Sequence, residues 1–118
     1  MMKNLLLVLI FLPYFVFGED ISGTGWIFQE NDGDKKIALF EKDGTFTYLQ
    51  LVGWSGNEGA VFSDDYDTYS VDGDRVVKSY SNGYRICSLT INSKKDRMSG
   101  TCINKTGLIV QTTGKLID

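Results

Sequence analysis

The chain contains no histidine, only two cysteines and a single proline. Without histidine, neither a Ser-His-Asp nor a Cys-His catalytic arrangement can form, and histidine-ligated zinc or iron sites are excluded. General acid–base chemistry near pH 7 would have to rely on carboxylates. After the first eighteen residues the sequence also lacks an amphipathic helical pattern of useful length. We therefore expect an all-β protein that is not an enzyme and that uses neither a cofactor nor a metal.

The N-terminal segment, residues 1–18, has the pattern of a signal peptide. Lys3 precedes an uncharged apolar run that includes the proline, and the small residue Gly18 fits the last position before a cleavage site at Glu19. The run is shorter than the roughly twenty apolar residues that a spanning helix needs, although an uncleaved anchor is the alternative. We expect cleavage near Gly18/Glu19, secretion or export to the periplasm, and no stable membrane insertion afterwards.

Residues 19–118 are sufficient for one small domain, whose core needs reinforcement at this size. The whole chain carries 12 lysines and arginines against 15 aspartates and glutamates, a net charge of −3. An acidic chain without a basic stripe argues against a nucleic-acid partner.

Short runs of β-forming residues alternate with turns rich in Gly, Asp and Asn, which favours an antiparallel all-β fold. The eight predicted strands are approximately Trp26–Gln29, Lys36–Glu41, Thr45–Val52, Tyr66–Val71, Arg75–Tyr80, Tyr84–Ile91, Arg97–Asn104 and Leu108–Thr113. Successive hairpins predict an up-and-down meander. We expect it to close as a small β-barrel, because closure hides the sheet edges. A β-sandwich is the alternative, since counting strands does not determine closure.

Both cysteines fall on one predicted hairpin, whose turn covers residues 93–96. This register sets Cys87 opposite Cys102, and their side chains point to the same face as the apolar residues beside them. Directly opposed residues are close enough for a disulfide. In an oxidising compartment the pair would stabilise the fold by roughly 3 kcal/mol, because it closes a loop of about fifteen residues. A redox-active pair is the alternative, but it lacks the Cys-x-x-Cys spacing.

A second hairpin, centred on Asp43, predicts an aromatic face. It sets Phe40 opposite Phe46 and Ala38 opposite Tyr48. Cross-strand aromatic pairs stabilise sheets, so these rings are candidates for the core.

Three segments, Gly23–Trp26, Phe40–Phe46 and Tyr69–Val76, together resemble the lipocalin-like small barrels of exported proteins. They are similar to that family's opening glycine–tryptophan strand, its F-x-x-D-G-T-F hairpin and its Y-x-V-x-G-D-x-V hairpin. The resemblance implies a barrel with a small apolar ligand inside. The candidate ligand-binding residues are Trp26, Phe40, Phe46, Tyr48 and Tyr69. An eight-stranded barrel can also be filled by its own side chains, and both alternatives remain open here.

The longest segment without a predicted strand, residues 53–63, contains Trp54 and Phe62. It is a candidate lid or partner-binding loop, with a Trp54 that merely caps the core as the alternative. Acidic clusters at residues 30–34 and 64–67 lack the ligand spacing of a calcium loop, so we interpret them as solvated turns. Asn104 begins an N-x-Thr glycosylation sequon.

These observations predict an exported binding protein that takes a small apolar ligand in the barrel or a protein partner at its loops. The alternative is a secreted or periplasmic inhibitor of a hydrolase, with one exposed loop entering the target's site.

Overall fold

The computed structural model describes residues 21–117, so the predicted signal peptide lies outside the described residues. Within this range, no helix has the length and apolar character needed to cross a bilayer. The strands, in chain order, are β1 (Gly25–Glu30), β2 (Lys35–Phe40), β3 (Phe46–Val52), β4 (Val61–Phe62), β5 (Thr68–Asp72), β6 (Arg75–Tyr80), β7 (Arg85–Ile91), β8 (Arg97–Asn104) and β9 (Ile109–Leu116). A single 3₁₀ turn, η2 (Ser81–Gly83), joins β6 to β7.

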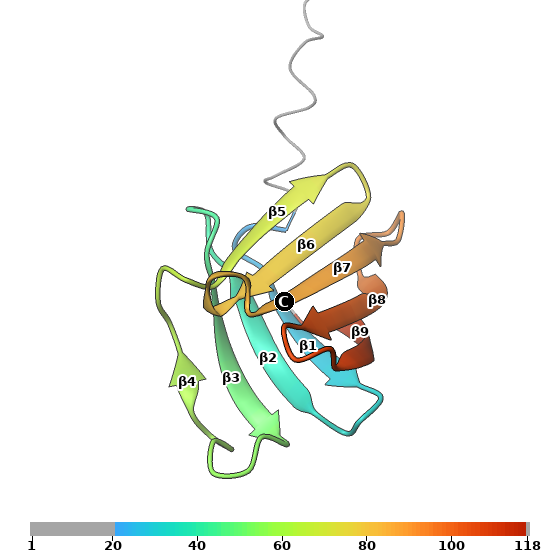
Figure 1. Cartoon of the computed structure of the whole chain (residues 1–118). Coiled ribbons are helices and arrows are strands. Elements are labelled where there is room, and N and C mark those ends of the chain that lie inside the picture. The colour runs from blue at the N-terminus through green and yellow to red at the C-terminus, as the bar shows by residue number, and fades with distance from the viewer. Residues whose placement is uncertain (1–20, 118) are drawn as a thin grey trace, which may run out of the picture.

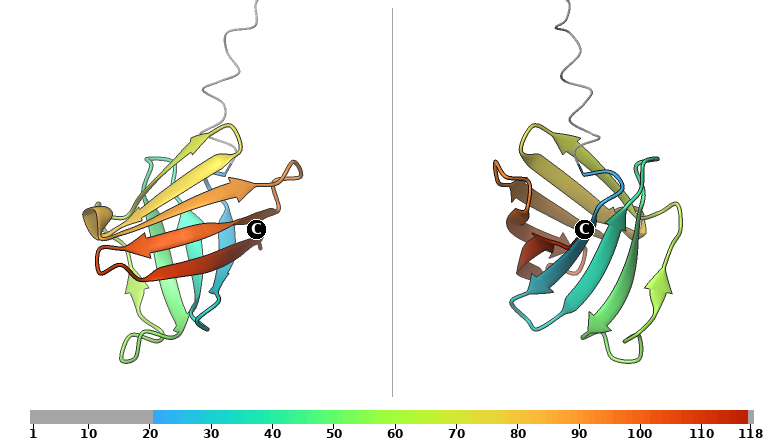
Figure 2. Two further views of the ribbon diagram at one scale, coloured as in Figure 1. Left: turned by 45° about the vertical axis from the view of Figure 1, so that its right-hand side comes forward. Right: turned by 180° about the vertical axis from the view of Figure 1, so that it is seen from behind.

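All nine strands belong to one antiparallel sheet with the order β4-β3-β2-β1-β9-β8-β7-β6-β5. The first and last strands, β1 and β9, pair with each other at the middle of this order. The sheet curls so that β1–β4 face β5–β9 across a shared interior, as a half-barrel (Figures 1 and 2). The predicted all-β meander is therefore confirmed, as one curled sheet.

The two edges of the curled sheet meet at one end only. An isolated bridge joins Thr45, beside β3, to Thr68 of β5. Two backbone hydrogen bonds support it: Phe46 N donates to Asp67 O at 3.0 Å, and Tyr69 N donates to Gly44 O at 2.9 Å. Further along β3 the short strand β4 occupies its edge instead. Closure is consequently partial.

The register of both predicted hairpins is confirmed. In β7–β8, Cys87 pairs with Cys102, Leu89 with Gly100 and Ile91 with Met98. In β2–β3, Phe40 pairs with Phe46 and Ala38 with Tyr48. The structure contains the Cys87–Cys102 disulfide, which points to an oxidising compartment.

The sequence predicted eight strands, and the described residues form nine. The additional strand, β4, lies inside the segment predicted as a loop, and it pairs only Val61 and Phe62 with β3. Two residues are too few to produce a recognisable period-two pattern, so this strand depends on the edge of β3 that it covers.

The core fills the end of the curl where the edges meet. Trp26, Phe28, Phe40 and Phe46 are completely buried. The Phe28 and Phe40 rings meet edge-on at 6.3 Å, and those of Phe40 and Phe46 at 6.1 Å. These rings occupy the interior at this end, as in small barrels filled by their own side chains.

Candidate functional site

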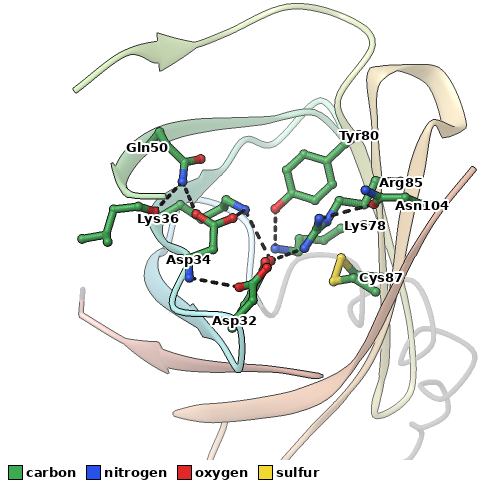
Figure 3. A network of polar contacts seen from close by, with 12 residues as sticks. Asp32, Asp34, Lys36, Gln50, Lys78, Tyr80, Arg85, Cys87 and Asn104 are labelled. Carbon is green, nitrogen blue, oxygen red and sulfur yellow. Dashed lines mark hydrogen bonds and ion pairs between the residues drawn. A yellow bond between two sulfur atoms is a disulfide. The ribbon is translucent and has the colours of Figure 1, made fainter. Parts of the chain in front are cut away.

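The opposite end of the curled sheet carries polar side chains on its inner face. They continue the inward-facing rows of the core, in which every second residue of a strand points inward. The next inward-facing residue beyond Phe28 is Glu30, the one beyond Ala38 is Lys36, and the one beyond Tyr48 is Gln50. Because side chains alternate between faces, each strand places its next inward residue at this mouth. The layer comprises Glu30, Lys36, Gln50, Lys78, Tyr80, Arg85 and Asn104. Most of it is drawn in Figure 3.

Glu30 is the buried centre of an ion-pair network. Its Oε2 atom lies 2.5 Å from Arg85 Nη2 and 3.4 Å from Lys36 Nζ. The Arg85 contact is an ion pair without hydrogen-bond alignment, since Nη2 has no hydrogen-bond partner within the described residues. Arg85 Nη1 donates to Asn104 Oδ1 at 3.3 Å. Glu30 was interpreted from the sequence as part of a solvated turn; it turns inward instead, because two cations compensate its charge.

A second group of contacts holds Asp34 on the wall formed by β2 and β3. Lys36 Nζ donates to Asp34 Oδ2 at 3.0 Å, and Gln50 Nε2 donates to Asp34 Oδ1. Burial alone would raise the pKa of Asp34, but the positive charge of Lys36 and the hydrogen bonds outweigh it and hold the pKa below its usual value. Asp34 is thus a carboxylate with both oxygens engaged.

Lys78 lies at the bottom of this layer, surrounded by aromatic rings. Its side chain is 1% exposed, and its Nζ lies 3.5 Å from the centroid of the Phe28 ring. Nζ donates to Tyr80 Oη at 2.9 Å and has no carboxylate partner within the described residues. Burial, followed by repulsion from Lys36, lowers the pKa of Lys78 well below its usual value. Burial, followed by the negative charge of Glu30, raises the pKa of Tyr80 well above its usual value.

Above these groups lies a pocket of about 620 Å³. Its volume falls within the range of about 300–1,000 Å³ that is typical of small-molecule sites. The lining combines aromatic and polar side chains: Asp32, Asp34, Lys36, Tyr48, Gln50, Trp54, Tyr80, Ser81, Tyr84, Arg85 and Asn104, with Gly53 at the loop. Asp34 and Lys36 lie on one side and Arg85 and Asn104 on the other, with Tyr80 between them (Figure 3). This arrangement can hold a ring while offering hydrogen bonds around it.

The loop between β3 and β4 forms the outer wall of the pocket. Gly59 N donates to Gln50 O at 2.7 Å, and Gln50 N donates to Ala60 O at 3.0 Å, so the end of the loop that precedes β4 is fixed to β3. Gly53 has a φ of +90°, and a Cβ there would lie 2.7 Å from Asp34 Oδ1. Only glycine allows the loop to approach Asp34 this closely.

Trp54 follows with a φ of +52°, a left-handed conformation that is unfavourable for a bulky residue. It is nevertheless 53% exposed. One face of its indole stacks on Phe62 at 5.1 Å, and Phe62 stacks in turn on Tyr48 at 4.9 Å. The strained backbone and the ring stack together hold an aromatic surface at the rim of the pocket.

The residues predicted from the sequence as ligand-binding separate into two groups. Trp26, Phe40 and Phe46 lie in the filled core, and Tyr69 packs against Phe40 at 4.8 Å while its hydroxyl donates to Glu41 O. Tyr48 lines the mouth pocket. Trp54 and Phe62, both predicted as loop residues, stack with Tyr48, although Phe62 belongs to β4.

The charged layer was not predicted from the sequence; its charged members are Glu30, Lys36, Lys78 and Arg85. A signal for it was present: extending the period-two pattern from Phe40 through Ala38 places Lys36 inward, and extending it from Val76 places Lys78 inward. Among residues 21–117, no three acidic, histidine or cysteine side chains are disposed to hold a metal ion.

The sequence matches no protein-family model and no curated protein. In fold, the chain is similar to the crystal structure of a "putative beta-lactamase" from Burkholderia vietnamiensis. The TM-score is 0.58 at 13% sequence identity, and the match covers 81% of this chain and 92% of that chain. At this identity the similarity concerns the fold alone.

Proposed function

We propose that this is an exported, non-enzymatic binding protein whose ligand occupies the mouth pocket. The observation that carries the proposal is the pocket itself, which is lined by an exposed, strained Trp54 together with Lys36 and Arg85, the cations that pair with the buried Glu30. Strained residues that persist in a structure are concentrated at ligand sites, and convergent polar groups in an aromatic pocket are typical of small-molecule binding.

The expected ligand differs from the one that the lipocalin resemblance implies. The filled aromatic core leaves the interior to protein side chains, and the mouth presents charged and polar groups above it. A purely apolar ligand would leave these groups without water or partners, which is unfavourable. The ligand class that fits best has a ring and several polar substituents.

The similarity to a protein named as a β-lactamase does not lead us to propose that activity. Serine β-lactamases use a Ser-x-x-Lys motif, and this chain contains none. It also contains no histidine for a histidine-ligated zinc site.

Intrinsic fluorescence offers a direct test, because Trp54 and the fully buried Trp26 are the only two tryptophans. The full-length chain would be expressed with export and purified with its disulfide intact, and native mass spectrometry would identify any bound ligand. Ligand binding should change the emission of Trp54 in the wild type. Measured by native mass spectrometry, Trp54→Ala should weaken binding at least about tenfold. Ile103→Ala is the matched control, since Ile103 is equally exposed but lies on the outer face of β8, beside Asn104. Equal binding by both variants would refute the mouth pocket as the site.

A second candidate function, inhibition of a secreted hydrolase, is favoured by the apolar rim. Val52, Trp54 and Val61 are all exposed around the ordered β3–β4 loop. A preorganised loop of this kind loses little entropy on binding a protein. In a panel of purified secreted proteases and glycosidases, this function requires inhibition by the wild type that Trp54→Ala abolishes. Absence of inhibition across the panel would leave the small-ligand proposal as the better one.

A further inference from the structure

The charged side chains that line the mouth pocket are paired within the protein, with the exception of the exposed Asp32. The pocket lining contains two carboxylates, Asp32 and Asp34, and two cations, Lys36 and Arg85. Lys36 is paired with Asp34 and Glu30, and Arg85 is paired with Glu30. An anionic ligand would have to compete for Lys36 or Arg85 with one of these largely buried pairs, and breaking such a pair leaves an uncompensated charge. A cationic ligand could pair without such competition only with Asp32, which is exposed, and ion pairs at exposed positions contribute little to binding.

Apart from one carboxylate oxygen of the exposed Asp32 and the buried Nε and Nη2 atoms of Arg85, the side-chain groups of the pocket that lack a hydrogen-bond partner among the described residues are neutral. The hydroxyls of Tyr48, Ser81 and Tyr84 form no side-chain hydrogen bond among the described residues, and neither does Asn104 Nδ2, whose neighbour Oδ1 accepts from Arg85. A hydroxyl both donates and accepts, and an amide nitrogen donates. These groups are complementary to ligand hydroxyls, which also donate and accept.

Trp54 adds an aromatic surface to this ring of neutral groups. One face of the indole rests on Phe62, and half of the residue is exposed at the pocket wall. The face of an aromatic ring carries partial negative charge, so it attracts C–H groups that carry partial positive charge. A pyranose ring presents such C–H groups on its faces and hydroxyl groups around its edge.

We propose that the ligand of the mouth pocket is a neutral saccharide, with one sugar ring against Trp54 and its hydroxyls bound by Tyr84, Ser81 and Asn104. This inference rests on the proposed function and adds the ligand class to it. The pocket volume of about 620 Å³ is within the range for such small-molecule sites. Free oligosaccharides and the chain ends of a polysaccharide both present such C–H faces and hydroxyl groups, so either could be the source of the ligand.

The test compares sugar trimers that have the same number of rings and different charge. The neutral probes are the trimers of N-acetylglucosamine, of β-1,4-linked glucose and of α-1,4-linked glucose. The charged probes are the glucosamine trimer, which is cationic, and the galacturonic acid trimer, which is anionic. 2-Naphthol serves as an aromatic probe that is not a sugar. Each is titrated into the full-length, disulfide-intact protein, with Trp54 fluorescence and NMR chemical shifts as readouts.

At least one neutral trimer should bind at least about tenfold more tightly than either charged trimer. Tyr84→Phe, which removes one hydroxyl from the pocket and keeps the ring, should weaken that binding about fivefold, the equivalent of one neutral hydrogen bond. Tyr66→Phe is the matched control, because it removes the hydroxyl of an exposed tyrosine that does not line the pocket. It should bind as the wild type does.

The possible outcomes separate this inference from the proposed function. If 2-naphthol or a charged trimer binds at the pocket and no neutral trimer does, the saccharide inference is wrong and the binding function stands. If no probe binds and no ligand co-purifies, both are wrong. Retention on insoluble chitin or cellulose that the soluble trimer displaces would support the inference with a polysaccharide as the source. Trimer binding without retention would support it with free oligosaccharides.

Discussion

Replacing Lys78 with methionine tests the energetics of the buried layer. Lys78 is completely buried, and its Nζ contacts the Phe28 ring and the Tyr80 hydroxyl. A cation–π contact of this kind contributes up to about 2 kcal/mol, whereas desolvation of an ammonium costs several kcal/mol. Desolvation therefore dominates, and it lowers the pKa of Lys78 in the folded protein. Methionine has a similar shape without the charge, so Lys78→Met should increase the free energy of unfolding by about 1–4 kcal/mol at pH 7.

The direction in which stability changes with pH follows from the difference in proton binding between the folded and unfolded states. The pKa of a lysine in the unfolded chain is about 10.4, and the pKa of Lys78 in the folded protein is lower. Between these two values the unfolded chain binds one proton more than the folded protein does. The stability of the wild type therefore rises with pH across this window, by up to about 1.4 kcal/mol per pH unit. Lys78→Met lacks this contribution, so its advantage should be largest at low pH and should shrink as the pH approaches 10.

The assay is urea unfolding at several pH values between about 7 and 9.5, below the range in which tyrosines ionise in the unfolded chain. The Cys87–Cys102 disulfide stays intact without reductant, and no free cysteine exists among the described residues to exchange with it. Lys35→Met is the comparison, because it removes the same charge from an outward-facing position on β2. If Lys78→Met is less stable than the wild type, or if the difference between them is constant over this range, the argument that desolvation dominates is refuted.

Three other sets of variants test the disulfide, the close strand approach and the ion pair. The double variant Cys87→Ala/Cys102→Ala opens a loop with a sequence separation of 15 and should lose about 3 kcal/mol of unfolding free energy; an unchanged urea midpoint would contradict this. Gly100→Ala places a Cβ 1.9 Å from Ser88 O, so the melting temperature should fall by the equivalent of at least about 2 kcal/mol, whereas Ser99→Ala should have little effect. Arg85→Met leaves Glu30 buried without its arginine and should cost about 3–5 kcal/mol by urea unfolding. Adding Glu30→Gln should restore part of that loss, and strict additivity in this double-mutant cycle would show that the two residues are not coupled.

The hairpins were predictable because their information is local. In β7–β8 a short turn and the alternation of apolar residues allow a single register, and the cysteines agree with it. The same holds for Phe40 and Phe46 in β2–β3. A slip of one residue would reverse every inward side chain in either hairpin, so the sequence strongly specifies the observed pairing.

Closure and the site were not predictable to the same degree, because they depend on contacts between distant strands. The Thr45–Thr68 bridge depends on how far the whole sheet coils, which no local pattern encodes. The Glu30–Arg85 pair joins β1 to β7, and their proximity requires that β9 and β8 lie between them in the sheet. A charged residue at the end of a strand is usually solvated, so its inward position by alternation carries little weight until its partner is known.

The charged layer and the filled core together determine where a ligand can bind. The rings of Phe28 and Phe46 lie below Lys78, and the paired charges of Glu30, Lys36 and Arg85 lie above it. A ligand that reached the core would have to displace packed rings and also desolvate or separate these ion pairs, and both steps are costly. Binding at the mouth requires neither, because Trp54 and the unengaged hydroxyls already face the pocket. The charged layer thus favours a shallow site with polar contacts over a deep apolar one.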